Sequence, residues 1–334
     1  MLKITTFTLR QSLRSSRCSN LNSIRRLTEG SLSTAVPLGA DKTLENNLKT
    51  ETNRLLKTGK KFWEDVKLND KLLTDKISIE IDTKPIRTPL GNLLAVSKDK
   101  PLLAYLIRQE WATLTELSLN TDSMPLTSLV SRCIDLASTE EPGCDPNLIA
   151  KIGADRNQIN SDLLRYLDTD TLLVFSPRAE LEGVLRADQD KLYLPIIQGI
   201  KQFLSDYRSH ASPIKLRTLD ADIHGLRGNM QSQETKDAAI NYLNSLSLWD
   251  LAVFEKTVLV TKSFVCGILL LQNKASKTVP LKQLQVDAER IAHLATLEIT
   301  HQTRRWGEVE DTHDVNKVDI RRNIGVAAIA AFSM

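Results

Sequence analysis

The hydrophobic periodicity of this chain changes once, and that change limits the folds open to it. In residues 61–97 apolar and polar positions alternate, as at Ile77, Ile79 and Ile81, and turn residues interrupt the pattern. A period of two residues is typical of half-buried strands. From residue 99 almost to the C-terminus, apolar residues recur at helical spacing instead. We therefore expect an α+β fold, with a small β-rich N-terminal domain followed by a larger all-helical C-terminal domain.

The N-terminal segment has the composition of an import signal. Residues 1–28 contain no Asp or Glu, and six Lys or Arg residues are scattered among serines there. An Arg-rich, Ser-rich and acid-free segment without a continuous apolar run is typical of a mitochondrial transit peptide rather than a secretory signal. We therefore assign residues 1–35 to a transit peptide and expect import into the mitochondrion.

The rest of the chain divides into a lead-in segment and two predicted domains. Polar residues and several lysines predict a linker or charged lead-in over 36–60. The β-rich N-terminal domain is expected over 61–122, and the helical C-terminal domain over 123–334. Within the helical part, the spacing predicts one helix over 146–167 and another over 247–272.

Removal of the transit peptide changes the charge balance. The whole chain has 44 basic and 41 acidic residues, a formal net charge of +3. Six basic residues and one acidic residue lie in residues 1–30, so the remaining chain has 38 basic and 40 acidic residues, or −2. This balance lacks the basic excess of a nucleic-acid-binding protein. The longest apolar run, 264–271, is well short of the roughly 20 residues that span a bilayer. We expect no nucleic-acid partner and no stable membrane insertion.

The chain lacks the short motifs of several common enzyme classes. Neither phosphate-binding fingerprint, GxxxxGKS/T or GxGxxG, is present, and HExxH and GxSxG are absent as well. The four cysteines form no CxxC pair, so neither a disulfide framework nor a cysteine zinc site is expected. We expect no cofactor, no metal ion and no catalytic residue, and hence no enzyme.

Three residues are interpreted as structural. Asp168 and Asp170 flank a threonine at a helix end, where Asp usually forms a turn or a cap rather than a catalytic pair. Trp111 lies at the i+4 position from Ile107. It is expected to pack its helix against the β unit.

A carboxylate interrupts an apolar helix stripe near the C-terminal end. The spacing predicts a helix over 280–306 in which Glu298 occupies the next position of an apolar stripe. The apolar members of that stripe are Ile291, Leu294 and Ala295. Because a buried charge is costly unless it is paired, Glu298 requires a local cation, a partner protein or a solvent-filled groove.

Two interpretations of Glu298 remain open at this point. The first is a pair within the helix, with Gln302 or Arg305, that closes a polar helix end. The second is a recognition surface for a protein partner. Arg304, Arg305 and Trp306 lie at the same end of the helix, and Trp and Arg are favoured interface anchors.

Several segments occur together in an order that is informative although each alone is unspecific. They are 61–66, 83–89, Glu110-Trp111, 166–171, the region of Trp249, and 297–307. Their order and spacing over about 55–330 resemble the mitochondrial chaperones that assemble the catalytic F1 head of ATP synthase by holding its alpha subunit. The segments 136–160 and 208–236 are longer than this family requires, and no role is assigned to them.

The resemblance implies a function as well as a fold. It implies a chaperone without enzymatic activity in the mitochondrial matrix. This chaperone would bind the free alpha subunit of F1-ATPase, prevent its aggregation and hand it on for assembly with the beta subunit. The family's important acidic residue falls on Glu298, and its Glu-Trp dipeptide places a structural role on Trp111. We expect a monomer.

Two other functions are carried as alternatives. The first is a matrix enzyme in which Glu298 and His301 act as acid and base while Arg304 or Arg305 holds an anionic substrate. The spacing of Glu298 and His301 is also that of di-iron helices, but the second copy that such sites require is missing. The other alternative is a structural subunit of a respiratory complex.

Overall fold

The fold is described from a computed structural model. It describes residues 61, 63–114, 123–141, 143–153, 155–209, 213–225, 228–274, 281–308 and 313–332. The predicted transit peptide (1–35) and lead-in segment (36–60) lie outside the described residues, and so does the expected domain boundary at 122/123.

Strand β2 (Lys76–Ile81) is the centre of a small antiparallel sheet. It pairs with β1 (Val66–Asn69), β3 (Lys84–Pro85) and β4 (Ala95–Ser97). The turn after β2 contains Asp82 at φ 54°, a left-handed conformation that Asp tolerates better than most residues. The Asp82 carboxylate accepts hydrogen bonds from the backbone N–H groups of Glu64 and Asp65, at 3.1 and 3.0 Å. The turn is thereby tied to the start of β1.

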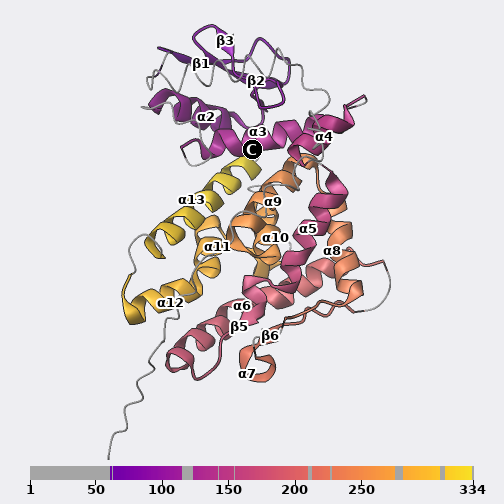
Figure 1. Ribbon diagram of the computed structural model, residues 1–334, viewed down its shortest axis with the longest axis vertical. Coiled ribbons are helices and arrows are strands. Elements are labelled where there is room, and N and C mark those ends of the chain that lie inside the picture. The colour runs from indigo at the N-terminus through magenta and orange to yellow at the C-terminus, as the bar shows by residue number, and fades with distance from the viewer. Residues whose placement is uncertain are drawn as a thin grey trace, which may run out of the picture. The chain divides into compact units, whose positions relative to one another are not determined.

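Helix α2 (Pro101–Thr113) covers this sheet and connects it to the helical part. Figure 1 shows α2 next to the strands, with α3 (Pro125–Ser138) beyond it. The buried residues of α2 include Ile107 and Trp111, as the i, i+4 spacing predicts. Pro101 begins the helix, where the missing N–H costs little.

Glu110 of α2 caps the next helix through tertiary contacts. The N-cap residue of α3, Met124, makes no side-chain hydrogen bond. Instead, the Glu110 carboxylate accepts from the backbone N–H groups of Leu126 and Thr127 and from the Thr127 hydroxyl, each at 2.8 Å. These N–H groups belong to the first turn of α3, which has no partners inside the helix.

We expect Glu110→Ala to lower the free energy of unfolding by about 1–2 kcal/mol, since it leaves the first turn of α3 without its acceptor. Urea denaturation followed by circular dichroism measures this change. Gln109→Ala is the matched control, because Gln109 is exposed on the same helix. Equal stability of the two variants would contradict the capping role of Glu110.

The rest of the chain is almost entirely helical, and the expected α+β class is confirmed. Helix α9 (Leu248–Thr261) packs against α3, α10 (Phe264–Gln272) and α13 (His313–Ala331) (Figure 1). The other helices are α4 (Pro146–Ile152), α5 (Arg156–Asp168), α6 (Val184–Ser205), α7 (Ala221–His224), α8 (Gln233–Ser245), α11 (Ala288–Ala295) and α12 (Leu297–Trp306), with 3-10 turns η1 (Thr171–Leu173), η2 (Glu180–Gly183) and η3 (Lys282–Leu284). A parallel pair joins β5 (Val174–Phe175) to β6 (Leu219–Asp220).

Two helices that the spacing predicts as continuous are divided. The helix expected over 146–167 is interrupted at Gly153, which has φ 57° and ends α4. The helix expected over 247–272 is interrupted at Lys262, which has φ 56° and ends α9. A left-handed residue ends a helix because its carbonyl and the following N–H leave the helical direction. In both cases a polar side chain then caps the next helix, Asp155 for α5 and Ser263 for α10.

The end of α13 is tied to the start of α2. The Lys100 ammonium donates to the carbonyl oxygens of Ala330, Ala331 and Phe332, at 3.1, 3.1 and 2.7 Å. The Trp249 indole N–H also donates to Ala330, at 3.0 Å. Carbonyl groups in the last turn have no partner within the helix, and a cation there also interacts favourably with the helix dipole.

Candidate functional site

The helix expected over 280–306 is two helices that meet at Thr296, and this changes the position of Glu298. Thr296 ends α11 and precedes α12, and its φ of −111° and ψ of 16° are not helical. The break shifts the helical phase, so the buried stripe of α11, which includes Ile291 and Leu294, does not continue to Glu298. The buried residues of α12 are Leu297, Thr300 and His301. The expectation that Glu298 occupies a core position is therefore wrong, because its side chain is exposed.

Among the described residues, the Glu298 carboxylate has one hydrogen-bond partner, which is uncharged. The Gln302 side-chain amide donates to Oε1 at 2.9 Å. Neighbouring protein atoms displace part of the water around the carboxylate, and the like charge of Glu180 lies nearby. Both effects raise the pKa of Glu298 above its ordinary value. Of the two intrahelical pairs considered from the sequence, the structure contains the one with Gln302.

Arg305 pairs with a different element. Its guanidinium lies 3.0 Å from the carboxylate of Glu182 in η2, and both side chains are largely exposed. Trp306 follows at the end of α12 with 65 % of its surface exposed. Glu298, Gln302, Arg305 and Trp306 are spaced i, i+4, i+7 and i+8, so they share one side of α12, which we call the α12 face. Arg304 is exposed as well, but helical spacing places it on another side.

The segment beside the α12 face has an uncommon backbone. Leu181 and Glu182 of η2 have φ values of 49° and 58°, and Gly183 follows at 77°. Non-glycine residues rarely adopt this conformation, and it costs on the order of 1 kcal/mol or more for each residue. A Cβ on Gly183 would lie 3.1 Å from the Arg178 carbonyl oxygen, so the turn also requires a residue without a side chain there. Such outliers are found preferentially at functional sites.

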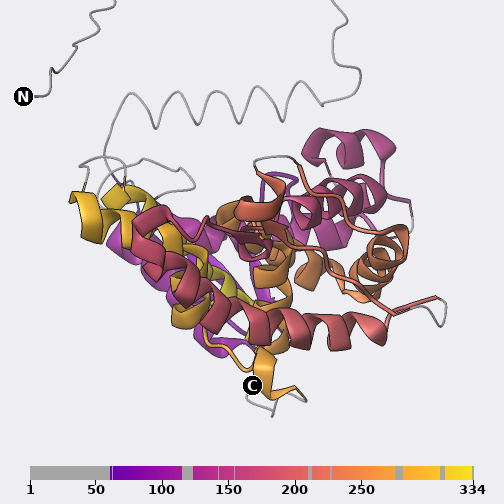
Figure 2. The same ribbon diagram turned by 90° about the horizontal axis from the view of Figure 1, so that it is seen from below.

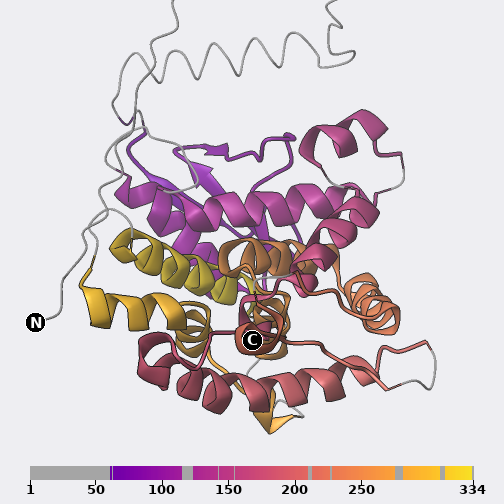
Figure 3. The same ribbon diagram turned by 60° about the horizontal axis from the view of Figure 1, so that its bottom comes forward.

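His301 does not form an acid–base pair with Glu298. Its ring is 7 % exposed, and Nε2 lies 2.9 Å from Oδ2 of Asp188 on α6. Figure 3 shows α12 (yellow-orange) beside the start of α6 (rose), and Figure 2 shows the length of α6 from another side. The acidic neighbours of α12, Glu180, Glu182 and Asp188, were not found by sequence reasoning, since they lie more than 100 residues from α12 and no local signal connects them to it.

Asp168 and Asp170 hold together parts of the chain that are distant in sequence. Asp168 accepts from the Gln231 backbone N–H at 2.8 Å and from the Lys236 ammonium at 2.7 Å. Asp170 is fully buried and binds groups at the start of α10. The Trp111 ring packs on Trp63 with the ring centroids 5.5 Å apart. The contacts of all three residues lie within the fold.

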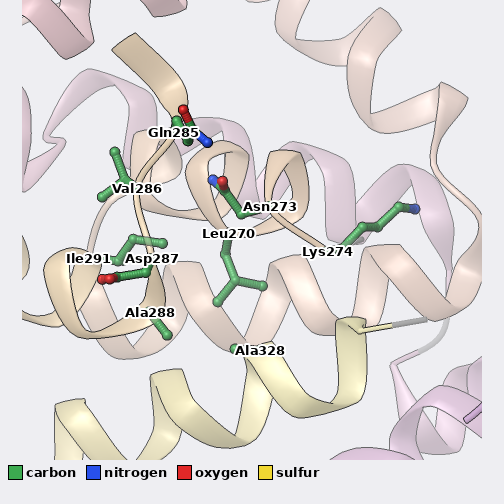
Figure 4. Close-up of a pocket in the computed structure, with 9 residues that line it drawn as sticks. All are labelled: Leu270, Asn273, Lys274, Gln285, Val286, Asp287, Ala288, Ile291 and Ala328. Carbon is green, nitrogen blue, oxygen red and sulfur yellow. The ribbon is translucent and has the colours of Figure 1, made fainter. Parts of the chain in front are cut away.

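The hollow shown in Figure 4 contains none of the predicted site residues. It has a volume of about 460 Å³ and lies between α10, α11 and α13. Three of its polar side chains are engaged with the protein: Asn273 donates to Leu269 and Leu284, Lys274 pairs with Asp250, and Asp287 caps α11. Among the described residues, no three His, Cys, Asp or Glu side chains gather as metal ligands. In the same part of the chain, no helix has the length and apolarity needed to cross a membrane.

Solved structures share this fold. Atp12 from Paracoccus denitrificans is 19 % identical and superposes with a TM-score of 0.57, covering 82 % of this chain and 97 % of the other. A putative chaperone from Agrobacterium tumefaciens is 21 % identical with a TM-score of 0.56, covering 87 % of this chain and 98 % of the other. At these identities the likeness shows the fold alone.

Sequence comparisons show the family. The family model "ATP12 chaperone protein" matches residues 60–201. "Protein ATP12, mitochondrial" of Saccharomyces cerevisiae is 57 % identical over 316 residues, which is 94 % of this chain and 97 % of the relative. The Schizosaccharomyces pombe protein of the same name is 31 % identical over 270 residues, or 81 % of each chain. These relatives are mitochondrial proteins, and the family is one of chaperones rather than enzymes. The chain belongs to the ATP12 chaperone family.

Proposed function

We propose that this protein is an ATP-independent assembly chaperone for the alpha subunit of mitochondrial F1-ATPase. It acts as a monomer in the mitochondrial matrix, where it binds the free alpha subunit, prevents its aggregation and hands it on to the beta subunit. Membership of the ATP12 chaperone family, the mitochondrial relatives and the acid-free N-terminal segment support this proposal. The α12 face is the surface that we assign to the alpha subunit.

The chemistry of the α12 face suits an unassembled subunit. The interface of a subunit that lacks its neighbour combines apolar and charged groups, and such a patch aggregates when it stays exposed. On the α12 face, an exposed indole (Trp306) and an arginine (Arg305) lie along one side with a carboxylate (Glu298). Trp and Arg are common anchors of protein interfaces.

The observation that carries the proposal is that Glu298 is exposed and is not paired with a cation among the described residues. This carboxylate is exposed, and its hydrogen-bond partner in the chain is the uncharged Gln302 amide. Arg305, the cation nearest along that side of α12, pairs with Glu182 instead. A cationic side chain of the alpha subunit would gain a charge-assisted hydrogen bond at Glu298, which is among the stronger kinds. Arg304 is exposed on another side of the same helix and would meet acidic groups of the alpha subunit that extend past the α12 face.

We expect Glu298→Lys to leave the fold intact and to weaken binding of the alpha subunit at least tenfold, because it replaces attraction of a cation by repulsion. Binding to purified alpha subunit and suppression of its aggregation by light scattering measure the effect. Glu234→Lys is the matched control, since Glu234 is also an exposed acid in the first turn of a helix, and both changes place a cation near the positive end of a helix dipole. If Glu298→Lys protects the alpha subunit as well as the wild type does, Glu298 has no role in recognition.

The alternatives make different predictions in mitochondria. Affinity purification from mitochondria that lack the beta subunit should recover this protein with free alpha subunit. Permanent comigration with a mature respiratory complex would instead favour a structural subunit.

A further inference from the structure

Helix α12 is attached to the rest of the protein by few side chains. Three of its residues, Leu297, Thr300 and His301, are buried, and the Thr300 hydroxyl donates back to Thr296 within the same segment. Among the described residues, two side-chain pairs connect α12 to other elements: His301 with Asp188, and Arg305 with Glu182. The second pair is exposed on both sides, and exposed ion pairs contribute little. The pair of His301 and Asp188 therefore has the larger share in holding the helix.

Two hydrogen bonds from α6 lie on opposite sides of the break at Thr296. Before the break, the Tyr193 hydroxyl donates to the carbonyl oxygen of Leu294 in α11, at 3.0 Å. After the break, Asp188 meets Nε2 of His301 in α12, at 2.9 Å. Helix α6 is well anchored, because Leu185, Tyr193 and Ile197 belong to its buried side. One helix therefore contacts both segments, α11 through Tyr193 and α12 through Asp188.

We propose that Asp188, Tyr193 and His301 are positioning residues for alpha-subunit binding. They fix the direction in which α12 presents Glu298 and the rest of the α12 face. This inference rests on the proposed function. His301 is 7 % exposed and Tyr193 is 2 % exposed, so neither presents a surface to a partner. They act through the orientation of α12.

The geometry also explains why a positioning device is needed here. Thr296 has no side-chain cap interaction with α12, and the first turn of the helix begins directly at the break. A break without its own fixed cap leaves the second helix free to change direction unless tertiary contacts prevent it. Binding through a few charged and aromatic groups is sensitive to such changes, because a partner has to meet them in one arrangement.

The test compares a disruptive and a conservative change at the same position. His301→Leu keeps a buried apolar side chain but removes the hydrogen bond to Asp188, and we expect alpha-subunit binding to weaken about tenfold. His301→Gln keeps a side-chain N–H donor, and binding should return to within about threefold of wild type. Tyr193→Phe should also weaken binding of the alpha subunit, because it removes the hydrogen bond to Leu294. His293→Leu is the control, since this neighbouring imidazole lies on α11 and forms no hydrogen bond with any residue in the described part of the chain.

A double-mutant cycle separates positioning from a general structural role. If His301 acts through the α12 face, His301→Leu should cost less in a Glu298→Gln background than in the wild type, because part of the oriented contact is already lost. Hydrogen exchange of the α12 amides should increase in His301→Leu while the melting temperature changes little. Equal effects of His301→Leu in both backgrounds, or a failure of His301→Gln to restore binding, would overturn the inference.

The outcomes also separate this inference from the proposed function. If the wild-type protein does not bind the alpha subunit, the proposed function fails. If the wild type binds, Glu298→Lys abolishes binding and His301→Leu binds as the wild type does, the proposed function stands and the positioning role is wrong.

Discussion

Replacement of Trp111 by arginine should remove the cooperative melting transition. The Trp111 ring is 8 % exposed, and its indole N–H donates to the Thr127 hydroxyl at 3.1 Å. Its backbone carbonyl accepts from the Trp63 indole at 3.2 Å. Loss of a buried Trp side chain costs about 3–5 kcal/mol, and a buried unpaired guanidinium adds several kcal/mol. Because proteins are stable by only about 5–15 kcal/mol, this change removes most or all of the stability.

The expected readout is insoluble protein, or a broad circular-dichroism melt without a clear midpoint. Trp306→Arg is the control, since the same substitution is made at a side chain that is 65 % exposed. It should change the free energy of unfolding by about 0.5 kcal/mol or less. Trp111→Phe should be intermediate, because it keeps an aromatic ring and loses the hydrogen bond to Thr127. A soluble Trp111→Arg variant with a wild-type melt would contradict the structural role of Trp111.

The second large effect is expected at Asp170, which connects η1 to α10. Its Oδ1 accepts from the Ser263 hydroxyl at 2.7 Å and from the Leu172 backbone N–H at 2.9 Å. Its Oδ2 accepts from the Val265 backbone N–H at 2.9 Å. In Asp170→Asn, the amide NH₂ replaces an acceptor and faces another donor. We expect the free energy of unfolding to fall by about 1–3 kcal/mol at pH 7.5.

The same carboxyl group predicts a dependence of stability on pH. Complete burial raises the pKa of Asp170 from 3.8 to about 6, although several hydrogen bonds oppose this shift. Because the pKa is higher in the folded state, folding favours the protonated form. The resulting stabilisation is fully present below pH 3.8 and is lost as the pH rises through about 6. Its full size is about 3 kcal/mol, from 1.36 kcal/mol for each pKa unit.

The measurement is the difference in unfolding free energy between the wild type and Asp170→Asn over pH 4–7. This difference should be larger near pH 4 than near pH 7, since the variant lacks the titrating group while all other groups cancel. A difference that does not change with pH, or that grows toward pH 7, would contradict the expected direction. Asp168→Asn is the comparison, because the Asp168 side chain is 23 % exposed. It should lower the free energy of unfolding at pH 7.5 by less than Asp170→Asn does.

Local patterns in the sequence were sufficient to predict the order and type of most helices and strands. The alternation of isoleucines predicted β2, and Pro101 and Pro125 each occupy the first position of a helix, which proline favours. These signals are reliable because they depend on residues that are neighbours in the chain. Asp170 caps η1 in agreement with the expected turn or cap, and that contact is also local.

The positions at which helices break were harder to predict from the sequence. The chain divides helices at Lys262 and Thr296, which are neither Gly nor Pro, so no strong breaker marks them. The break at Lys262 is accompanied by Asp170, which binds the start of α10 from 93 residues away in the chain. Periodicity alone continued each helix through its break, and this error placed Glu298 on a buried stripe.

The amino-acid sequence by itself determined the class of fold, the family and the residues that bear the candidate chemistry, because composition, periodicity and motif order are properties of the chain. Tertiary structure alone decided that Glu298 is exposed, that Arg305 pairs with Glu182, and that His301 faces Asp188. The physical reason is that exposure and pairing depend on how α12 lies against α6 and η2. Those contacts join residues more than 100 positions apart, and no local pattern specifies them.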